Sequence, residues 1–92
     1  MSNENQGAGS KLVGVTGVGL AAVGAAHFVR PELFESITQQ AFPNDTLRYT
    51  YINGGIETAL GVGLAVRKTR PLAVAGLVAY SVYLARAISR TR

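Results

Sequence analysis

The stretch LVGVTGVGLAAVGAAHFV, residues Leu12–Val29, decides the fold of this sequence. It contains no charged residue when its histidine is neutral, and Lys11 and Arg30 stand at its two ends. Roughly 18 residues rise about 27 Å as an α-helix, which is close to the ~30 Å hydrocarbon core of a bilayer. Pro31 prevents a straight continuation, because it lacks a backbone donor and restricts the residue before it. We therefore predict a transmembrane helix over residues 12–29.

Two more apolar runs follow, at residues 47–66 and 72–88. The first comes after a Pro-Asn-Asp-Thr turn, in which Asp45 or Thr46 is expected to cap the helix. A short basic connection, residues 67–71, separates the two runs. Each run is long enough to cross a bilayer, so we predict a second and a third transmembrane helix.

The segment between the first two runs, residues 32–42, has a different pattern. Apolar and polar residues recur there at helical spacing, which is typical of an amphipathic helix lying in the membrane interface. Its apolar members are Leu33, Phe34, Ile37, Ala41 and Phe42. Residues 1–10 are polar and are predicted to form a disordered tail. The predicted fold is therefore all-α, with one membrane domain over residues 11–92 that contains three transmembrane helices and a short interfacial helix between the first two.

The composition favours a membrane protein over a soluble one. Of the 92 residues, 48% are hydrophobic and only 15% are charged, against about a quarter in soluble domains. The alternative is a soluble three-helix bundle, whose helices would be apolar nearly all round and whose internal glycines would cost about 1 kcal/mol each. The absence of cysteine excludes disulfides, thiolate metal sites and thiol catalysis.

The net charge of +4 is distributed as in membrane proteins. Basic residues stand at the ends of the apolar runs and are not mixed with aromatic residues on one surface, so we predict contacts with phospholipids and none with nucleic acid. The residues expected at lipid headgroups are Arg30, Arg48, Arg67, Lys68 and Arg70. The protein is predicted to lie in the inner membrane. Because the basic connection should face the cytoplasm, the N-terminus is expected on the cytoplasmic side too.

Small residues recur at a spacing of four on the first two predicted spans. Such residues let helix backbones approach closely where no hydrophobic effect drives association. They either form a groove for a partner protein or pack the first two spans together. The residues expected in helix packing are Gly17, Ala21 and Ala25 on one helix, and Gly55, Ala59 and Gly63 on the other.

Glu57 is the most unusual residue of the predicted membrane domain. A carboxylate in the middle of a span is costly and normally faces protein or water. Thr50 and Asn53 lie on the same helical face, so the three residues predict a polar contact region. Its role is a proton relay, hydrogen bonding to a quinone or other ligand, a lock to a partner helix, or an internal lock. The internal partners considered are His27, Thr16 and Tyr80.

His27 lies near the end of the first predicted span. A lone histidine makes a poor metal site, so no metal and no cofactor are predicted. A hydrogen bond to a headgroup or to the second span fits its position better. Counted by depth from the helix ends, Glu57 lies about two turns deeper than His27, so a direct pair requires a shifted or tilted second span. No catalytic constellation or nucleotide-binding motif is present, and we predict no enzymatic activity.

Two stretches of the sequence resemble a known membrane family. They are His27-Phe-Val-Arg-Pro-Glu-Leu-Phe34 and Tyr51-Ile-Asn-Gly-Gly-Ile-Glu57, the latter followed by the basic connection. In this order they are similar to DoxX-like membrane proteins, and the likeness extends over about residues 14–77. The resemblance implies four membrane helices, of which this chain would have three, and a link to quinone-dependent redox chemistry. In size the chain also resembles a prokaryotic respiratory supercomplex association factor.

These features predict an accessory or assembly subunit of a multi-subunit membrane complex. The chain has few means of acting alone, and its resemblance to a supercomplex association factor implies a bacterial respiratory supercomplex as the partner. The alternatives are a DoxX-like, quinone-linked redox subunit that uses Glu57 and His27, and a carrier of protons or small solutes.

Overall fold

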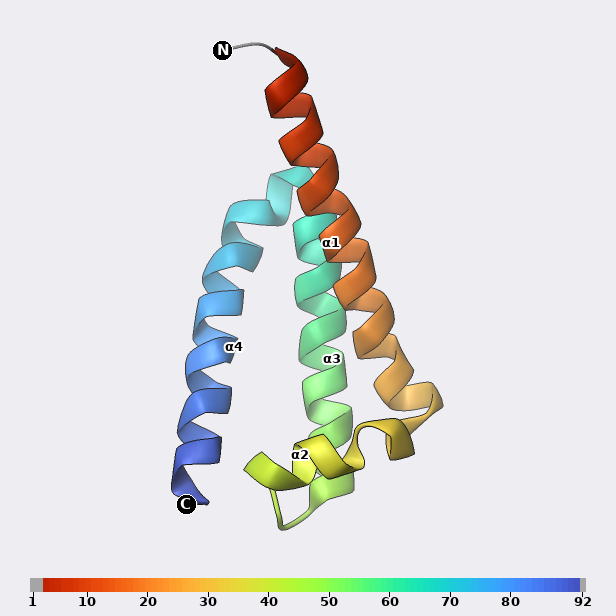
Figure 1. Cartoon of the computed structure of the whole chain (residues 1–92), viewed down its shortest axis with the longest axis vertical. Coiled ribbons are helices and arrows are strands. Elements are labelled where there is room, and N and C mark those ends of the chain that lie inside the picture. Colours follow the sequence, from red (N-terminus) through yellow and green to blue (C-terminus); the bar gives the residue numbers. More distant parts are fainter. Residues whose placement is uncertain (1–2, 92) are drawn as a thin grey trace.

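A computed structural model describes residues 3–91, and residues 1, 2 and 92 lie outside the described part. Within this range the elements, in chain order, are α1 (Asn3–Val29), η1 (Pro31–Leu33), α2 (Glu35–Ala41), α3 (Thr46–Ala65), η2 (Arg67–Thr69) and α4 (Arg70–Arg90). The helices α1 and α4 run in the same direction, α3 returns between them, and α2 crosses one end (Figure 1). The molecule measures 50 × 27 × 17 Å, so the three long helices lie side by side almost in one layer.

The prediction of three transmembrane helices was wrong. Two segments in the described part are long and apolar enough to cross a membrane, Gly7–Val29 in α1 and Arg67–Arg90, which contains α4. The helix α3 is not among them, because Arg48, Asn53 and Glu57 lower its mean hydropathy. The length of the second run, residues 47–66, was therefore predicted well, but the weight of its polar residues was not.

The interfacial amphipathic helix predicted over residues 32–42 is also not observed. The segment divides into η1 and the short helix α2, which contacts α3 and α4. Thr38 is its buried residue, whereas Leu33 and Ile37 are 61% and 69% exposed. The segment is therefore not the single helix that was predicted, because it is broken between Leu33 and Glu35.

The polar residues ahead of the first apolar run belong to α1. The helix begins at Asn3, so residues 3–10, which were predicted to be disordered, are helical. The rest of the predicted tail, residues 1 and 2, lies outside the described part. At the other boundary, α3 begins at Thr46 after Asp45, which has the left-handed φ of 56° and makes no capping hydrogen bond with its side chain.

The helices α1 and α3 touch through their backbones. A Cβ atom placed on Gly17 would lie 2.6 Å from the carbonyl oxygen of Gly61. About two turns further along the contact, a Cβ on Gly24 would lie 2.7 Å from the carbonyl oxygen of Gly54 and 2.5 Å from Thr58 Oγ1. Only glycine fits at these positions, because any side chain would overlap the facing helix.

The contact between α3 and α4 is made by side chains. Figure 1 shows α4 standing farther from α3 than α1 does. Leu60 reaches Gly76, where a Cβ would lie 2.6 Å from Leu60 Cδ2, and Glu57 reaches Tyr80. The three helices therefore form one close backbone pair and a third helix attached by longer side chains.

The interior contains more polar than apolar side chains among the described residues. The buried apolar residues are Leu64, Ala73 and Ala87, and the buried polar residues are His27, Thr38, Thr50 and Asn53. Many large apolar side chains point outward instead, such as Val15 at 70% and Leu72 at 76% exposure. This distribution is the reverse of that in a soluble domain.

Candidate functional site

Five polar side chains from three helices meet near the end of the molecule that carries α2, and we call them the polar cluster. They are His27 of α1, Asn53 and Glu57 of α3, and Tyr80 and Tyr83 of α4. The Tyr80 hydroxyl donates to Glu57 Oε2 over 2.7 Å, and the Tyr83 hydroxyl donates to Asn53 Oδ1 over 3.1 Å. These two bonds connect α3 to α4.

His27 connects α1 to the same cluster. Its ring is 4% exposed and stacks on Phe34, with ring centroids 3.7 Å apart. Nδ1 lies 2.8 Å from the Val23 carbonyl oxygen, which can only accept, so Nδ1 carries a proton. Nε2 then faces Glu57 Oε2 at 3.8 Å. The two atoms are therefore close to each other but beyond direct hydrogen-bond distance.

The helix register explains why this pair forms. The segment between α1 and α3 carries the chain beyond the end of α1 before it turns back (Figure 1). As a result the first two turns of α3 lie past α1, and Gly54 lies against the Cβ atom of His27. Glu57 then comes within reach of His27. Depth counting from the helix ends placed the two residues too far apart, because it assumed that both helices end at the same level.

Thr50 does not join the polar cluster. It is fully buried, and its hydroxyl donates to the Thr46 carbonyl oxygen of its own helix over 2.9 Å. Thr16 likewise bonds to the Leu12 carbonyl oxygen of α1. Of the internal partners considered for Glu57, the structure brings His27 and Tyr80 together with it. Tyr83 was missed, although a buried Asn53 amide signals the need for a partner.

A small cavity of about 150 Å³ borders the polar cluster. His27, Glu57, Tyr80 and Phe34 line it, together with apolar side chains. Sites for small organic ligands usually measure about 300–1,000 Å³, so this cavity is small for a quinone or a similar cofactor. It is large enough for a few water molecules, since each occupies about 30 Å³ in the liquid.

The predicted small-residue stripes divide between two surfaces. Gly17 and Ala21 pack against α3 as one of the two alternatives predicted. Ala25 is exposed, and Gly24 makes the contact with α3 that was expected of Ala25. On α3 the residues that face α1 are at positions 54, 58, 61 and 65, so the interval between them alternates between four and three residues. Gly55 therefore faces Phe28 at ordinary contact distance.

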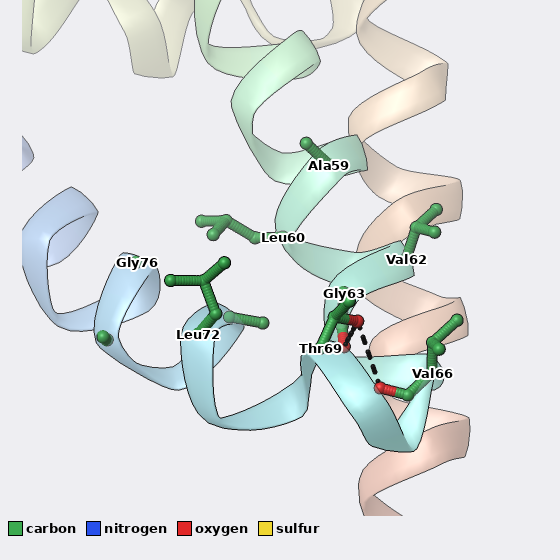
Figure 2. Close-up of a pocket in the computed structure, with 10 residues that line it drawn as sticks. Ala59, Leu60, Val62, Gly63, Val66, Thr69, Leu72 and Gly76 are labelled. Atoms are coloured by element: carbon green, nitrogen blue, oxygen red, sulfur yellow. Dashed lines mark hydrogen bonds between the residues drawn. The ribbon is translucent and has the colours of Figure 1, made fainter.

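The other two members of the second stripe, Ala59 and Gly63, line an apolar groove between α3 and α4, which Figure 2 shows. The groove has a volume of about 700 Å³ and is almost wholly apolar. At one end lies η2, where the Thr69 hydroxyl donates to the carbonyl oxygens of Gly63 and Val66 (Figure 2). These bonds fix the position of η2 at that end of the groove.

The five predicted headgroup residues lie at two ends of the molecule. Arg67, Lys68 and Arg70 lie in η2 and at the start of α4, while Arg30 and Arg48 lie at the end that carries α2. Arg30 is paired with Glu32, and both side chains are more than half exposed.

Together, the fold and the site define a small all-helical protein with two helices able to span a membrane and a polar cluster that connects its three long helices. Within this class the chain belongs to the family described as Domain of unknown function (DUF8561), whose model matches residues 16–90. No curated protein and no solved structure gave a significant match.

The resemblance to DoxX-like proteins was therefore wrong. The family model that covers α3, α4 and most of α1 is that of an uncharacterised domain and not of the DoxX-like family. No relative supports the likeness to a respiratory supercomplex association factor either. Both resemblances depended on short stretches at helix ends and on size, and these features recur in unrelated helical membrane proteins.

Proposed function

We propose that this protein is an accessory subunit of a larger complex in the bacterial inner membrane, anchored through α1 and α4. The observation that carries the proposal is the reversed distribution of polarity. Polar side chains are buried and paired, while large apolar side chains cover the outside. In the spanning windows of α1 and α4 only 17% and 11% of the residues are buried, whereas core helices of soluble proteins are mostly buried.

The polar cluster supports a structural role better than a catalytic one. Among the described residues, every buried side-chain nitrogen or oxygen has a hydrogen-bond partner. A binding site that waits for a ligand would be expected to leave some of these groups unpaired. The cluster therefore acts as an internal lock that holds the helices in position.

The groove between α3 and α4 supports association with a partner protein. Its lining contains Ala59, Gly63 and Ala75, which allow another helix to approach closely. Val62 and Leu72 at its edges are 52% and 76% exposed. We propose that a transmembrane helix of the larger complex occupies this groove, and respiratory electron-transfer complexes are the first partners to test.

The experiment is affinity purification of tagged variants from native membranes in mild detergent. Ala75→Trp and Ala59→Trp fill the groove from exposed positions, so they should release the partner without unfolding the chain. Ala25→Trp is the matched control, because Ala25 is exposed on α1 away from the groove. Equal recovery of the same partner with all three variants would refute the proposal, as would a wild-type chain that purifies alone.

The second candidate, proton exchange, has one specific observation in its favour. His27 Nε2 and Glu57 Oε2, two groups able to exchange protons, are 3.8 Å apart beside the cavity. Glu57→Gln separates the two functions, because the amide oxygen still accepts from Tyr80 but the side chain no longer exchanges a proton. Retained assembly with unchanged proton transport in Glu57→Gln supports the lock, whereas loss of proton transport with intact assembly supports exchange.

A further inference from the structure

Four cations gather where η2 joins α3 to α4, and we call them the basic corner. They are Lys11 of α1, Arg67 and Lys68 of η2, and Arg70 of α4. Ser10, which precedes Lys11, accepts hydrogen bonds from Arg67 Nε at 2.9 Å and from Arg70 Nη1 at 3.2 Å. One hydroxyl thus holds two guanidinium groups from different elements beside one another.

The basic corner is not neutralised by the side chains that the structure describes. Over residues 7–91 the ion pairs are His27 with Glu57 and Arg30 with Glu32, neither of which involves the corner. Two guanidinium groups held by a neutral hydroxyl repel each other and keep further N–H donors free. Phosphate, like carboxylate, is an anion that matches such paired, planar donors.

An apolar hollow begins directly at the basic corner. It has a volume of about 450 Å³ and is lined by Lys11, Gly14, Val15, Val18 and Ala65. The guanidinium of Arg70 lies near its edge, since Nη2 is 3.7 Å from the position of a Cβ on Gly14, one of the lining residues. The surface thus passes from cations to exposed valines along one face of α1.

We propose that the basic corner binds the phosphate of one anionic phospholipid, whose acyl chain lies in this hollow. The inference rests on the membrane location proposed above. A phosphate ester joined to a hydrocarbon chain matches both parts of the surface, whereas a free phosphate would leave the hollow empty. Each basic residue near an anionic headgroup strengthens binding roughly fivefold.

The test is native mass spectrometry of protein reconstituted with equal amounts of phosphatidylglycerol and phosphatidylcholine. Lys11→Gln with Lys68→Gln removes two charges whose side chains make no hydrogen bonds among the described residues, so the fold should persist. Retention of phosphatidylglycerol should fall about 25-fold in this double variant. Val18→Trp, which fills the hollow without changing charge, should also lower it.

The control variant, Arg30→Gln with Arg48→Gln, makes the same change in charge at the other end. There the hydrogen bond from Arg30 holds the pKa of the Glu32 carboxyl below its usual value, so Arg30 is already paired. The control should keep wild-type retention of phosphatidylglycerol to within about twofold. Equal losses in the two double variants would overturn the proposal, because they would indicate diffuse attraction only.

Two further outcomes separate the sources of failure. Displacement of phosphatidylglycerol by an equal concentration of soluble glycerol phosphate would refute the proposal that the ligand is a lipid. It would identify the basic corner as a site for free phosphate. Carbonate extraction of the wild-type membranes tests the location independently. A chain that resists extraction but shows no preference for phosphatidylglycerol refutes this inference alone, whereas a chain that is extracted refutes the membrane location as well.

Discussion

Replacing Tyr80 with phenylalanine removes one hydroxyl group and leaves the ring in place. That hydroxyl donates to Glu57 Oε2 over 2.7 Å and connects α4 to α3. Hydrogen bonds to charged groups contribute about 1.5–3 kcal/mol in soluble proteins, while those between membrane helices average about 0.6 kcal/mol and reach about 1.7 kcal/mol. The Glu57 side chain is 17% exposed and has few contacts with solvent. We therefore expect Tyr80→Phe to lower the free energy of unfolding by about 1 kcal/mol.

The assay is reversible unfolding in mixed micelles, followed by circular dichroism, on Tyr80→Phe, Glu57→Leu and the double variant. Because the two side chains bond to each other, the two losses should not add, and the coupling free energy should be about 1 kcal/mol. Tyr51→Phe is the control, because its ring stacks on Phe28 and its hydroxyl makes no hydrogen bond among the described residues. Additive losses, or an equal loss in Tyr51→Phe, would refute the proposed lock.

Three other changes test the rest of the structure. Gly24→Leu should destabilise the chain by about 3 kcal/mol or more, because it overlaps the backbone of α3, whereas Gly19→Leu meets nothing within 4 Å and should be neutral in the same unfolding assay. Tyr83→Phe should cost only about 0.5–1 kcal/mol of unfolding free energy, since its bond to Asn53 is longer and joins neutral groups; a larger loss than in Tyr80→Phe would contradict this order. Lys68→Cys gives a unique exposed thiol, and it should resist impermeant maleimide on intact cells if η2 faces the cytoplasm; rapid labelling from outside would reverse the topology.

The sequence was sufficient to predict the positions of the long helices, but not all their properties. An uncharged apolar run between Lys11 and Arg30 can hardly be anything but a helix, and α1 does end at Val29. Its start was missed, because the polar residues before Lys11 carry no apolar periodicity. The number of spans was overestimated because run length was weighed above the polar residues of α3, whose partners lie in other helices.

The site was predicted in its residues more than in its geometry. A mid-helix Glu57 required a partner on physical grounds, and Tyr80 was among those considered. Whether His27 reaches it depends on how far α3 extends past α1, and the short connecting segment determines that offset without any sequence motif. Likewise a spacing of four predicts close contact but leaves open which surface makes it: in the structure Gly17 lies against α3, whereas Ala59 lines the groove between α3 and α4.

The contrast between the two helix contacts has a consequence for biosynthesis. The contact of α1 with α3 is made by backbone, glycines and side chains that all precede Val66, so everything it requires has been translated once Ala65 has left the ribosome. The α3–α4 contact needs the side chains of Tyr80 and Tyr83, which are translated later. We therefore expect α1 to pair with α3 first during synthesis and α4 to dock afterwards. A chain that is truncated after Val66 should still form the paired hairpin of α1 and α3. It would lack the groove for a partner, because α4 forms one side of that groove.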